Sequence, residues 1–261
     1  MTSLADQPTI SLPRDVRMPL LGFGTWQATG QRAYDAVRRA LDVGYRHIDT
    51  ATMYGNEAEI GRAVRDSGVP REDIFITTKL PPERAGRERQ TLGASLDALD
   101  TGYVDLWLIH WPPSRGALVP TWREFLAVRD EELARSVGVS NYDAGQLDEL
   151  VDATGEMPAV NQIRWSPSLY DPRVAAEHRE RGVVLEGYSP FKSTDLKDPV
   201  LTRIAEAHGV STAQVVLRWH IDHGFVVIPK SVTPDRIRTN FEVFGFSLTP
   251  DELREIDALG R

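Results

Sequence analysis

Four polar side chains with complementary chemistry stand at, or just beyond, the ends of predicted strands. They are Asp49, Tyr54, Lys79 and His110. Apolar stretches rich in β-branched residues lead into three of them, at positions 45–48, 74–78 and 104–109. Such stretches are typical of buried parallel strands. If neighbouring strands end on the same rim, an acid, a phenol, an amine and an imidazole share one small volume.

These residue types suit the delivery of a proton to an oxygen that is gaining negative charge. A tyrosine has an ordinary pKa of about 10, and a nearby lysine ammonium lowers that pKa because it favours the phenolate. Asp49 is expected to hold Lys79 charged and in place, and His110 to orient a carbonyl oxygen. The chemistry fits the reduction of an aldehyde or ketone.

Each of these residues also has a structural explanation. A lone aspartate at a strand end often caps a helix or pairs with an arginine, and a lysine there often extends to water. His110, followed by Trp-Pro, fits a buried structural residue. Their joint placement on consecutive strands favours the catalytic interpretation.

Composition limits the class of protein. The chain has 261 residues and no cysteine, which excludes disulfides and thiol nucleophiles. The net charge of −8 argues against a general nucleic-acid surface. No apolar run is long enough to cross a membrane, and residues 1–13 do not resemble a signal peptide. We therefore expect a cytoplasmic protein without thiolate metal sites and without membrane or nucleic-acid partners.

Apolar runs alternate with amphipathic segments along the whole chain. Strands are predicted at 20–24, 47–49, 74–79, 104–110, 136–140, 159–163, 183–189 and 225–229. Helices are predicted at 31–43, 57–66, 88–99, 122–132, 144–153, 174–181, 200–207, 212–221, 234–240 and 250–259. Segments 9–12 and 16–19 form an expected hairpin. This pattern predicts an α/β fold in one domain over 1–261, a (β/α)₈ TIM barrel with an N-terminal β-hairpin and extra C-terminal helices.

An anion site is visible near the C-terminus, although a Rossmann motif is absent. The segment 22–26, GFGTW, lacks the third glycine of GxGxxG. By contrast, 228–236 is a strand end, a polar loop and a helix start, with Thr233 as candidate N-cap. The amino terminus of a helix attracts phosphate, and Lys230 and Arg236 add positive charge. A capped surface helix with ordinary basic residues is the alternative.

Other polar pairs also end strands. Ser140-Asn141 and Asn161-Gln162 carry amides that suit a carboxamide such as that of nicotinamide. Tyr188 is placed to stack on a flat ring. Alone, these residues are only strand-end polar groups.

Taken together, the motifs resemble the aldo-keto reductase superfamily, of bacterial type. They are GFGTW, GYRHIDTATMYGNE, TTKL, DLWLIHWP, GVSNY, NQIRWSP, GYSP and LRWHIDHGFVVIPKSVTPDRIRTNFEVF, in order from residue 20 to about 257. The resemblance implies an NADPH-binding barrel without metal that reduces aldehydes or ketones by hydride transfer from nicotinamide C4. It places Asp49, Tyr54, Lys79 and His110 on the catalytic tetrad, with Tyr54 as proton donor.

The resemblance also implies contacts to cofactor and substrate. Implied cofactor-binding residues are Gly24, Thr25, Trp26, Ser140, Asn141, Gln162, Tyr188, Ser189, Lys230, Ser231, Val232, Arg236 and Asn240. Implied substrate-binding residues are Trp26, Tyr54, His110 and Trp111. The small-molecule partner is a carbonyl compound, and a monomer is expected.

Three features depart from the family pattern. Thr239 stands where many members have a glutamate that contacts adenine, and Arg164, Trp165 and Ser166 replace an acidic-aromatic-histidine pattern. The sequence ends at Arg261, directly after the last predicted helix, whereas many relatives have a tail over the substrate pocket. A shallow, apolar pocket with poor discrimination among aldehydes and dicarbonyls is therefore expected.

Two other functions remain open. A barrel that binds the cofactor and reports redox state to a partner is the alternative from another class, and an intact tetrad argues against it. A preference for NADH is the other, and Lys230 and Arg236 argue against it.

Overall fold

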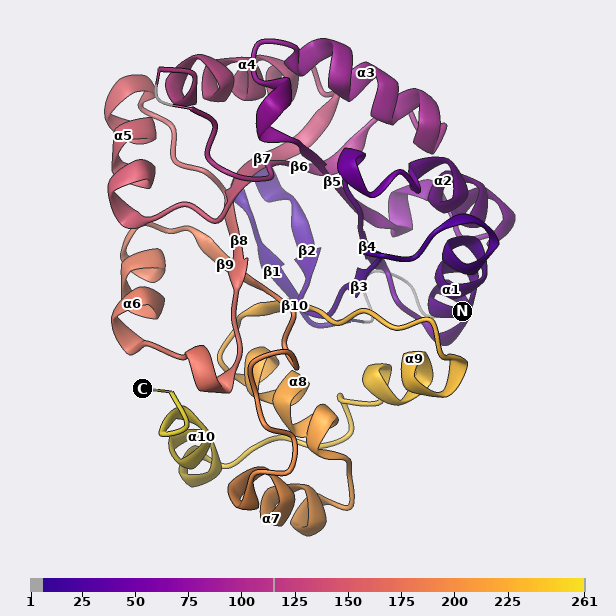
Figure 1. Ribbon diagram of the computed structural model, residues 1–261, viewed down its shortest axis with the longest axis vertical. Coiled ribbons are helices and arrows are strands. Elements are labelled where there is room, and N and C mark those ends of the chain that lie inside the picture. Colours follow the sequence, from indigo (N-terminus) through magenta and orange to yellow (C-terminus); the bar gives the residue numbers. More distant parts are fainter. Residues whose placement is uncertain (1–6, 115, 261) are drawn as a thin grey trace.

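A closed barrel of parallel strands forms the centre of the molecule (Figure 1). The computed structural model describes residues 7–114 and 116–260. Within these ranges, eight strands pair in sequence order from β3 to β10. Bridges between Leu21 and Val227, and between Gly24 and Lys230, join the first strand to the last. The predicted (β/α)₈ barrel is confirmed.

The barrel strands lie close to their predicted positions. They are β3 (Phe23–Gly24), β4 (His47–Asp49), β5 (Phe75–Leu80), β6 (Val104–Ile109), β7 (Ala134–Ser140), β8 (Val160–Arg164), β9 (Val184–Tyr188) and β10 (Val226–Ile228). The first strand is shorter than predicted, because Leu21 makes only an isolated bridge to Val227. All eight carboxyl ends point to one rim, as parallel pairing requires.

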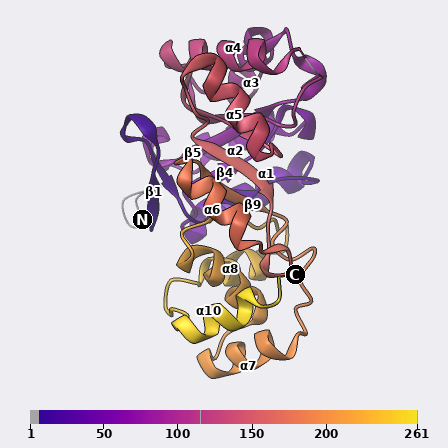
Figure 2. The same cartoon turned by 90° about the vertical axis from the view of Figure 1, so that its left-hand side faces the viewer.

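The predicted N-terminal hairpin is present at the opposite end of the barrel. It consists of β1 (Thr9–Ser11) and β2 (Arg17–Pro19), paired antiparallel. Figure 1 shows the hairpin behind the barrel, and Figure 2 shows it to one side. Leu12 and Met18 are buried there and close the core from below.

Helices surround the barrel and bury its outer face (Figure 1). Their bounds are α1 (Gly30–Val43), α2 (Glu57–Asp66), α3 (Glu88–Leu99), α4 (Leu118–Asp130), α5 (Ala144–Thr154), α6 (Pro172–Glu180), α7 (Pro199–His208), α8 (Thr212–Asp222), α9 (Pro234–Phe241) and α10 (Pro250–Asp257). Helix α4 begins four residues before the predicted 122, since Pro120 fits in the first turn, where its missing N–H has no partner to lose.

The two sides of the barrel wall differ in chemistry. Apolar side chains fill the layer between strands and helices, where the rings of Trp107 and Phe125 stack 3.8 Å apart. The interior instead contains buried polar groups, among them Asp49, Lys79 and Glu186. Buried charges are costly unless they are paired or used, so the barrel interior is the candidate functional site.

One helix contact has no room for a methyl group. A Cβ on Gly61 in α2 would lie 2.1 Å from the carbonyl oxygen of Leu99, at the end of α3. We expect Gly61→Ala to lower the free energy of unfolding by about 1–3 kcal/mol, measured by urea denaturation. Gly93→Ala in α3 is the control, because its Cβ would meet nothing within 4 Å; it should stabilise the helix by about 0.5–1 kcal/mol. Equal changes in the free energy of unfolding for Gly61→Ala and Gly93→Ala would contradict the close packing of Gly61 against Leu99.

Candidate active site

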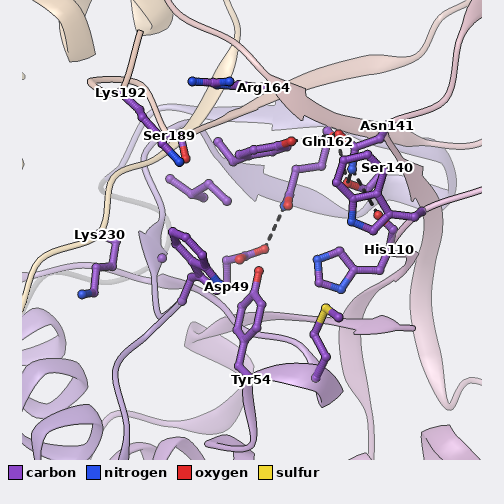
Figure 3. Close-up of a pocket in the computed structure, with 16 residues that line it drawn as sticks. Asp49, Tyr54, His110, Ser140, Asn141, Gln162, Arg164, Ser189, Lys192 and Lys230 are labelled. Atoms are coloured by element: carbon purple, nitrogen blue, oxygen red, sulfur yellow. Dashed lines mark hydrogen bonds between the residues drawn. The ribbon is translucent and has the colours of Figure 1, made fainter. Parts of the chain in front are cut away.

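The structure places the four proposed catalytic residues at the carboxyl-terminal rim of the barrel. Asp49 ends β4, Lys79 lies near the end of β5, His110 directly follows β6, and Tyr54 ends a short 3₁₀ helix after β4. A cavity of about 360 Å³ opens there (Figure 3). It is lined by Gly24, Trp26, Asp49, Met53, Tyr54, His110, Trp111, Ser140, Asn141, Gln162, Arg164, Tyr188, Ser189, Lys192, Ile228 and Lys230.

Hydrogen bonds fix the loop that presents Tyr54. The Thr52 hydroxyl donates to the carbonyl of Lys79 at 2.9 Å. The Asn56 amide donates to the carbonyls of Thr25 and Ala28 at 3.1 and 2.8 Å. Gly55, between them, has φ +63°, in the left-handed region that favours glycine. Tyr54 is therefore held from both sides of its loop.

Asp49 and Lys79 form a buried ion pair below the cavity. The Lys79 ammonium donates to both carboxylate oxygens, at 2.7 and 2.8 Å, and to the carbonyl of Thr50 at 2.8 Å. All three of its N–H donors are thus used. Burial by itself lowers the pKa of Lys79, but Asp49 and Tyr54 raise it, and the net pKa lies above the ordinary value. Lys79 is a permanent cation beneath the phenol.

Tyr54 keeps its proton in this environment. The Lys79 Nζ lies 5.2 Å from the centre of the Tyr54 ring. Burial raises the pKa of Tyr54, while Lys79 acts to lower it, and the net pKa is above the ordinary value. Lys79 therefore acts on the pKa of Tyr54 in the expected direction, but burial outweighs the ammonium. The phenol is fully protonated at neutral pH, as a proton donor must be.

His110 is a neutral imidazole beside that phenol. Its ring centre lies 5.7 Å from that of Tyr54, in an edge-on arrangement, and both rings project into the cavity (Figure 3). Burial, and to a lesser degree Lys79, lower the pKa of His110 to about 3. A neutral ring has one N–H donor, which can hold a carbonyl oxygen without delivering a competing proton.

The amide of Gln162 has one orientation. Its nitrogen donates to Asp49 Oδ2 at 2.8 Å and to Glu186 Oε2 at 3.0 Å. Because both neighbours are carboxyl groups, the nitrogen must face them. The side-chain oxygen of Gln162 is then available to accept a hydrogen bond from a ligand in the cavity.

The hydrogen bonds of Asn141, on the opposite wall of the cavity, also fix the orientation of its amide. The Asn141 nitrogen donates to the His110 carbonyl at 3.1 Å and to the Ser140 hydroxyl at 2.9 Å, which uses both of its N–H groups. The Tyr188 hydroxyl donates to the Asn141 side-chain oxygen at 3.0 Å. The groups that remain here are acceptors. Acceptors on Asn141 and Gln162 suit the NH₂ of a carboxamide.

Asn161, which the sequence also pointed to, does not face the cavity. Its amide donates to the Tyr142 carbonyl at 2.9 Å and lies 3.0 Å from a ring nitrogen of His178 in α6. Neighbouring side chains on a strand point to opposite faces of the sheet. The Gln162 side chain therefore points into the barrel, and the Asn161 side chain points outward, toward the helices.

The proposed phosphate-binding residues lie at one end of the cavity and beyond it. Lys230 lines the cavity, whereas Ser231, Val232, Arg236 and Asn240 lie outside its lining, on the following loop and on α9. Thr233 occupies the N-cap position of α9 without a side-chain cap bond; its N–H donates to Ser231 Oγ at 3.1 Å. Arg236 is exposed and has no ion pair among the residues described.

Other predicted and unpredicted residues complete the site. Thr25 is buried outside the cavity lining, and its hydroxyl donates to the Asp49 carbonyl at 2.9 Å. Burial and the charge of Arg32, a residue not expected here, lower the pKa of Lys230.

Lys192 was not predicted as a site residue, and its ammonium lies over the Trp26 ring, 5.9 Å from the ring centre. Arg164 lines the cavity and could have been predicted to do so, because residues two apart on a strand point to the same face and Gln162 stands two residues before it.

Three large apolar side chains line part of the cavity and are exposed to solvent. They are Trp26, Met53 and Trp111, with exposed fractions of 48%, 52% and 46%.

Across residues 7–114 and 116–260, no cluster of three or more His, Cys, Asp or Glu side chains could hold a metal ion. None of the helices in these ranges is both long and apolar enough to cross a membrane.

Known proteins share this sequence and architecture. Residues 20–261 match the Aldo/keto reductase family. "Methylglyoxal reductase DkgA" of Yersinia pestis is 43% identical over 257 residues, covering 97% of this chain and 93% of that protein. An aldo/keto reductase from Brucella melitensis superposes with a TM-score of 0.94 at 42% identity, covering 97% of this chain and 99% of that one.

A third similar protein was solved with a cofactor. A variant of Gox0644 in complex with NADPH has a TM-score of 0.93 and 35% identity, covering 98% of this chain and 94% of that one. The family match spans most of the sequence, and the structural likeness spans the entire barrel. This chain belongs to the aldo/keto reductase family.

Proposed function

We propose that this protein reduces aldehydes and ketones to alcohols with NADPH, and that Tyr54 is the proton donor. The observation that carries the proposal is the protonated phenol of Tyr54 beside a neutral His110 in one cavity, with the buried, permanently charged Lys79 beneath them. The match to Methylglyoxal reductase DkgA supports carbonyl reduction.

In the proposed mechanism, the chain's own residues manage the carbonyl oxygen and its proton. Bound NADPH supplies a hydride to the carbonyl carbon. The Tyr54 hydroxyl and the His110 ring hold the carbonyl oxygen between them. As that oxygen gains negative charge, the phenolic O–H bond breaks and its proton goes to the oxygen, giving the alcohol. Lys79 stabilises the phenolate that remains, and Asp49 keeps Lys79 in place.

The residues around the cavity fit this cofactor. The side-chain oxygen of Gln162 suits the nicotinamide carboxamide, as does the second lone pair of the Asn141 side-chain oxygen, which already accepts a hydrogen bond from Tyr188. The Tyr188 ring suits the flat face of the nicotinamide. Lys230 and Arg236 suit a phosphate beside the start of α9. The Gox0644 complex supports the assignment, since its fold and this one superpose closely.

The exposed apolar side chains of the cavity fit small, uncharged aldehydes and dicarbonyls. Trp26, Met53 and Trp111 offer surface rather than directed hydrogen bonds, so differences among substrates should be about 1–3 kcal/mol per methylene. A panel of carbonyls, assayed by loss of NADPH absorbance with NADH alongside, tests the function. Binding of NADPH with no single-turnover oxidation by any aldehyde would favour the sensor or scaffold alternative.

Cofactor choice should depend on Arg236. A 2′-phosphate has a charge of about −2 near neutral pH, and NADH has nothing at that position. We expect Arg236→Ala to weaken NADPH binding by about 10- to 100-fold, the equivalent of one charge-assisted hydrogen bond or two, and to leave NADH binding nearly unchanged. Quenching of tryptophan fluorescence during cofactor titration measures both affinities.

A neighbouring arginine provides the matched control. Arg238, in the same helix, already pairs with Glu242 at 2.9 Å. Arg238→Ala should leave both cofactor affinities near wild type. Equal losses of NADPH and NADH binding in Arg236→Ala would mean that this arginine supports the helix rather than the phosphate.

A further inference from the structure

Glu186 is a carboxyl group buried in the barrel interior that the mechanism above does not use. It lies on β9 and is inaccessible to solvent. Its Oε2 accepts a hydrogen bond from Gln162 at 3.0 Å. Its Oε1 has no hydrogen-bond partner in the described structure. An acid in such a position is a strong candidate for a functional role, because a polar group buried without a partner is costly.

No cation is free to neutralise Glu186. On β4, Asp49 adds negative charge, and burial lowers the pKa of His47 to about 3, so that ring is neutral. His47 Nε2 also lies 3.8 Å from Glu186 Oε1, too far for a hydrogen bond. Lys79 on β5 is the one cation among the groups that act on Glu186, and its N–H donors are all used by Asp49 and Thr50.

The other packing partners supply no charge. Gln162 on β8 is a neutral amide, and Val226 on β10 is paired opposite Glu186. The carboxyl groups of Asp49 and Glu186 therefore lie near a single ammonium, that of Lys79, inside the barrel. The Gln162 side-chain nitrogen donates a hydrogen bond to each of these carboxyl groups. Burial and Asp49 raise the pKa of Glu186 to about 8.

We propose that Glu186 is a positioning residue that holds the Gln162 amide toward the nicotinamide carboxamide, and that a negative charge on Glu186 weakens Tyr54 as a proton donor. The proposal rests on the function proposed above. Without an acceptor at Glu186, one of the two bonds that orient Gln162 is lost. When Glu186 ionises, a second negative charge acts on Lys79 and Tyr54, which disfavours the phenolate formed during reduction.

The first test separates positioning from general damage. Glu186→Gln retains an acceptor for Gln162 without a titrating group, whereas Glu186→Leu removes the acceptor at similar size. We expect Glu186→Leu to weaken NADPH binding about tenfold and to leave the binding of adenosine 2′,5′-bisphosphate, which lacks nicotinamide, unchanged. Glu186→Gln should bind both like wild type. Equal affinity of Glu186→Leu and wild type for NADPH would overturn the positioning role.

The second test is the pH profile of kcat/KM for aldehyde reduction between pH 6 and 9.5. The kcat/KM of the wild type should decline as pH rises past the ionisation of Glu186, and Glu186→Gln should lack this alkaline decline. Glu57→Gln is the control: Glu57 is another buried carboxyl, bonded to Thr78 at 2.6 Å and Ser95 at 3.1 Å, outside the cavity lining. An unchanged decline in Glu186→Gln would overturn the proposed effect on Tyr54.

A third measurement needs no turnover. Since the pKa of Glu186 is raised on folding, the native state binds the extra proton, and stability falls as pH rises from the ordinary carboxyl value toward about 8. Glu186→Gln lacks this loss, so its advantage in Tm over wild type should grow from pH 5 to pH 8.5. A constant difference would overturn the ionisation. If this trend holds but no variant reduces any carbonyl, the proposed function fails instead.

Discussion

Tyr54→Phe should lower kcat for aldehyde reduction by about 10²–10⁴-fold, the usual contribution of general acid catalysis. The substitution removes only the hydroxyl from a ring that the surrounding loop already fixes. Burial raises the pKa of Tyr54, so the wild-type phenol retains its proton until the carbonyl oxygen demands it. His110 cannot replace it, because its pKa of about 3 leaves the ring neutral at neutral pH, without the acidic imidazolium proton.

Folding and cofactor binding should survive this change. Thermal unfolding and NADPH titration by tryptophan fluorescence check both properties, and stopped-flow absorbance gives the rate of the chemical step. Tyr103→Phe is the control, since Tyr103 lies beside the starts of β5 and β6, at the opposite end of the barrel. Turnover of Tyr54→Phe within about threefold of wild type would sink the assignment, because general acid catalysis is worth far more.

Lys79→Met should damage stability and catalysis together. Removal of one partner of a buried ion pair typically costs about 3–5 kcal/mol, because the other charge is left without compensation. Here Asp49 would remain, held only by Gln162 on its side-chain oxygens. Catalysis should fall as well, because no cation would stabilise the phenolate of Tyr54. Urea denaturation and steady-state kinetics measure the two effects.

A double variant separates the two effects. Asp49→Asn combined with Lys79→Met removes both charges, and replacement of a whole buried pair is often nearly neutral. We expect the double variant to regain most of the lost stability and almost none of the lost turnover. If the double variant regained turnover with its stability, Lys79 would be a structural residue only.

Much of the fold was predictable because it depends on local patterns. Runs of β-branched residues and helical periodicities alternate regularly, and eight such units close into a barrel. Main-chain geometry then brings strand ends to one rim, so Asp49, Lys79 and His110 were expected to be neighbours. The short 3₁₀ helix that ends at Tyr54 places the phenol on the same rim. These inferences need only residue order and the length of each element.

Burial and charge, by contrast, act through space and were decided by the tertiary structure. The sequence predicted the effect of Lys79 on Tyr54 with the correct sign, but it contained no measure of how deeply the phenol is buried, and burial proved the larger influence. Asn161 and Gln162 are adjacent and chemically alike, yet only strand orientation sends one into the barrel.

The role of Glu186 shows the same limit most clearly. In the sequence it is one acid within an apolar run, 137 residues from Asp49 along the chain (186 − 49). Closure of the barrel brings both carboxyl groups to a single amide, that of Gln162. Short patterns therefore determined which elements form and, to within about four residues, where each lies. The protonation of the interior instead depended on distances that exist only after the barrel has closed.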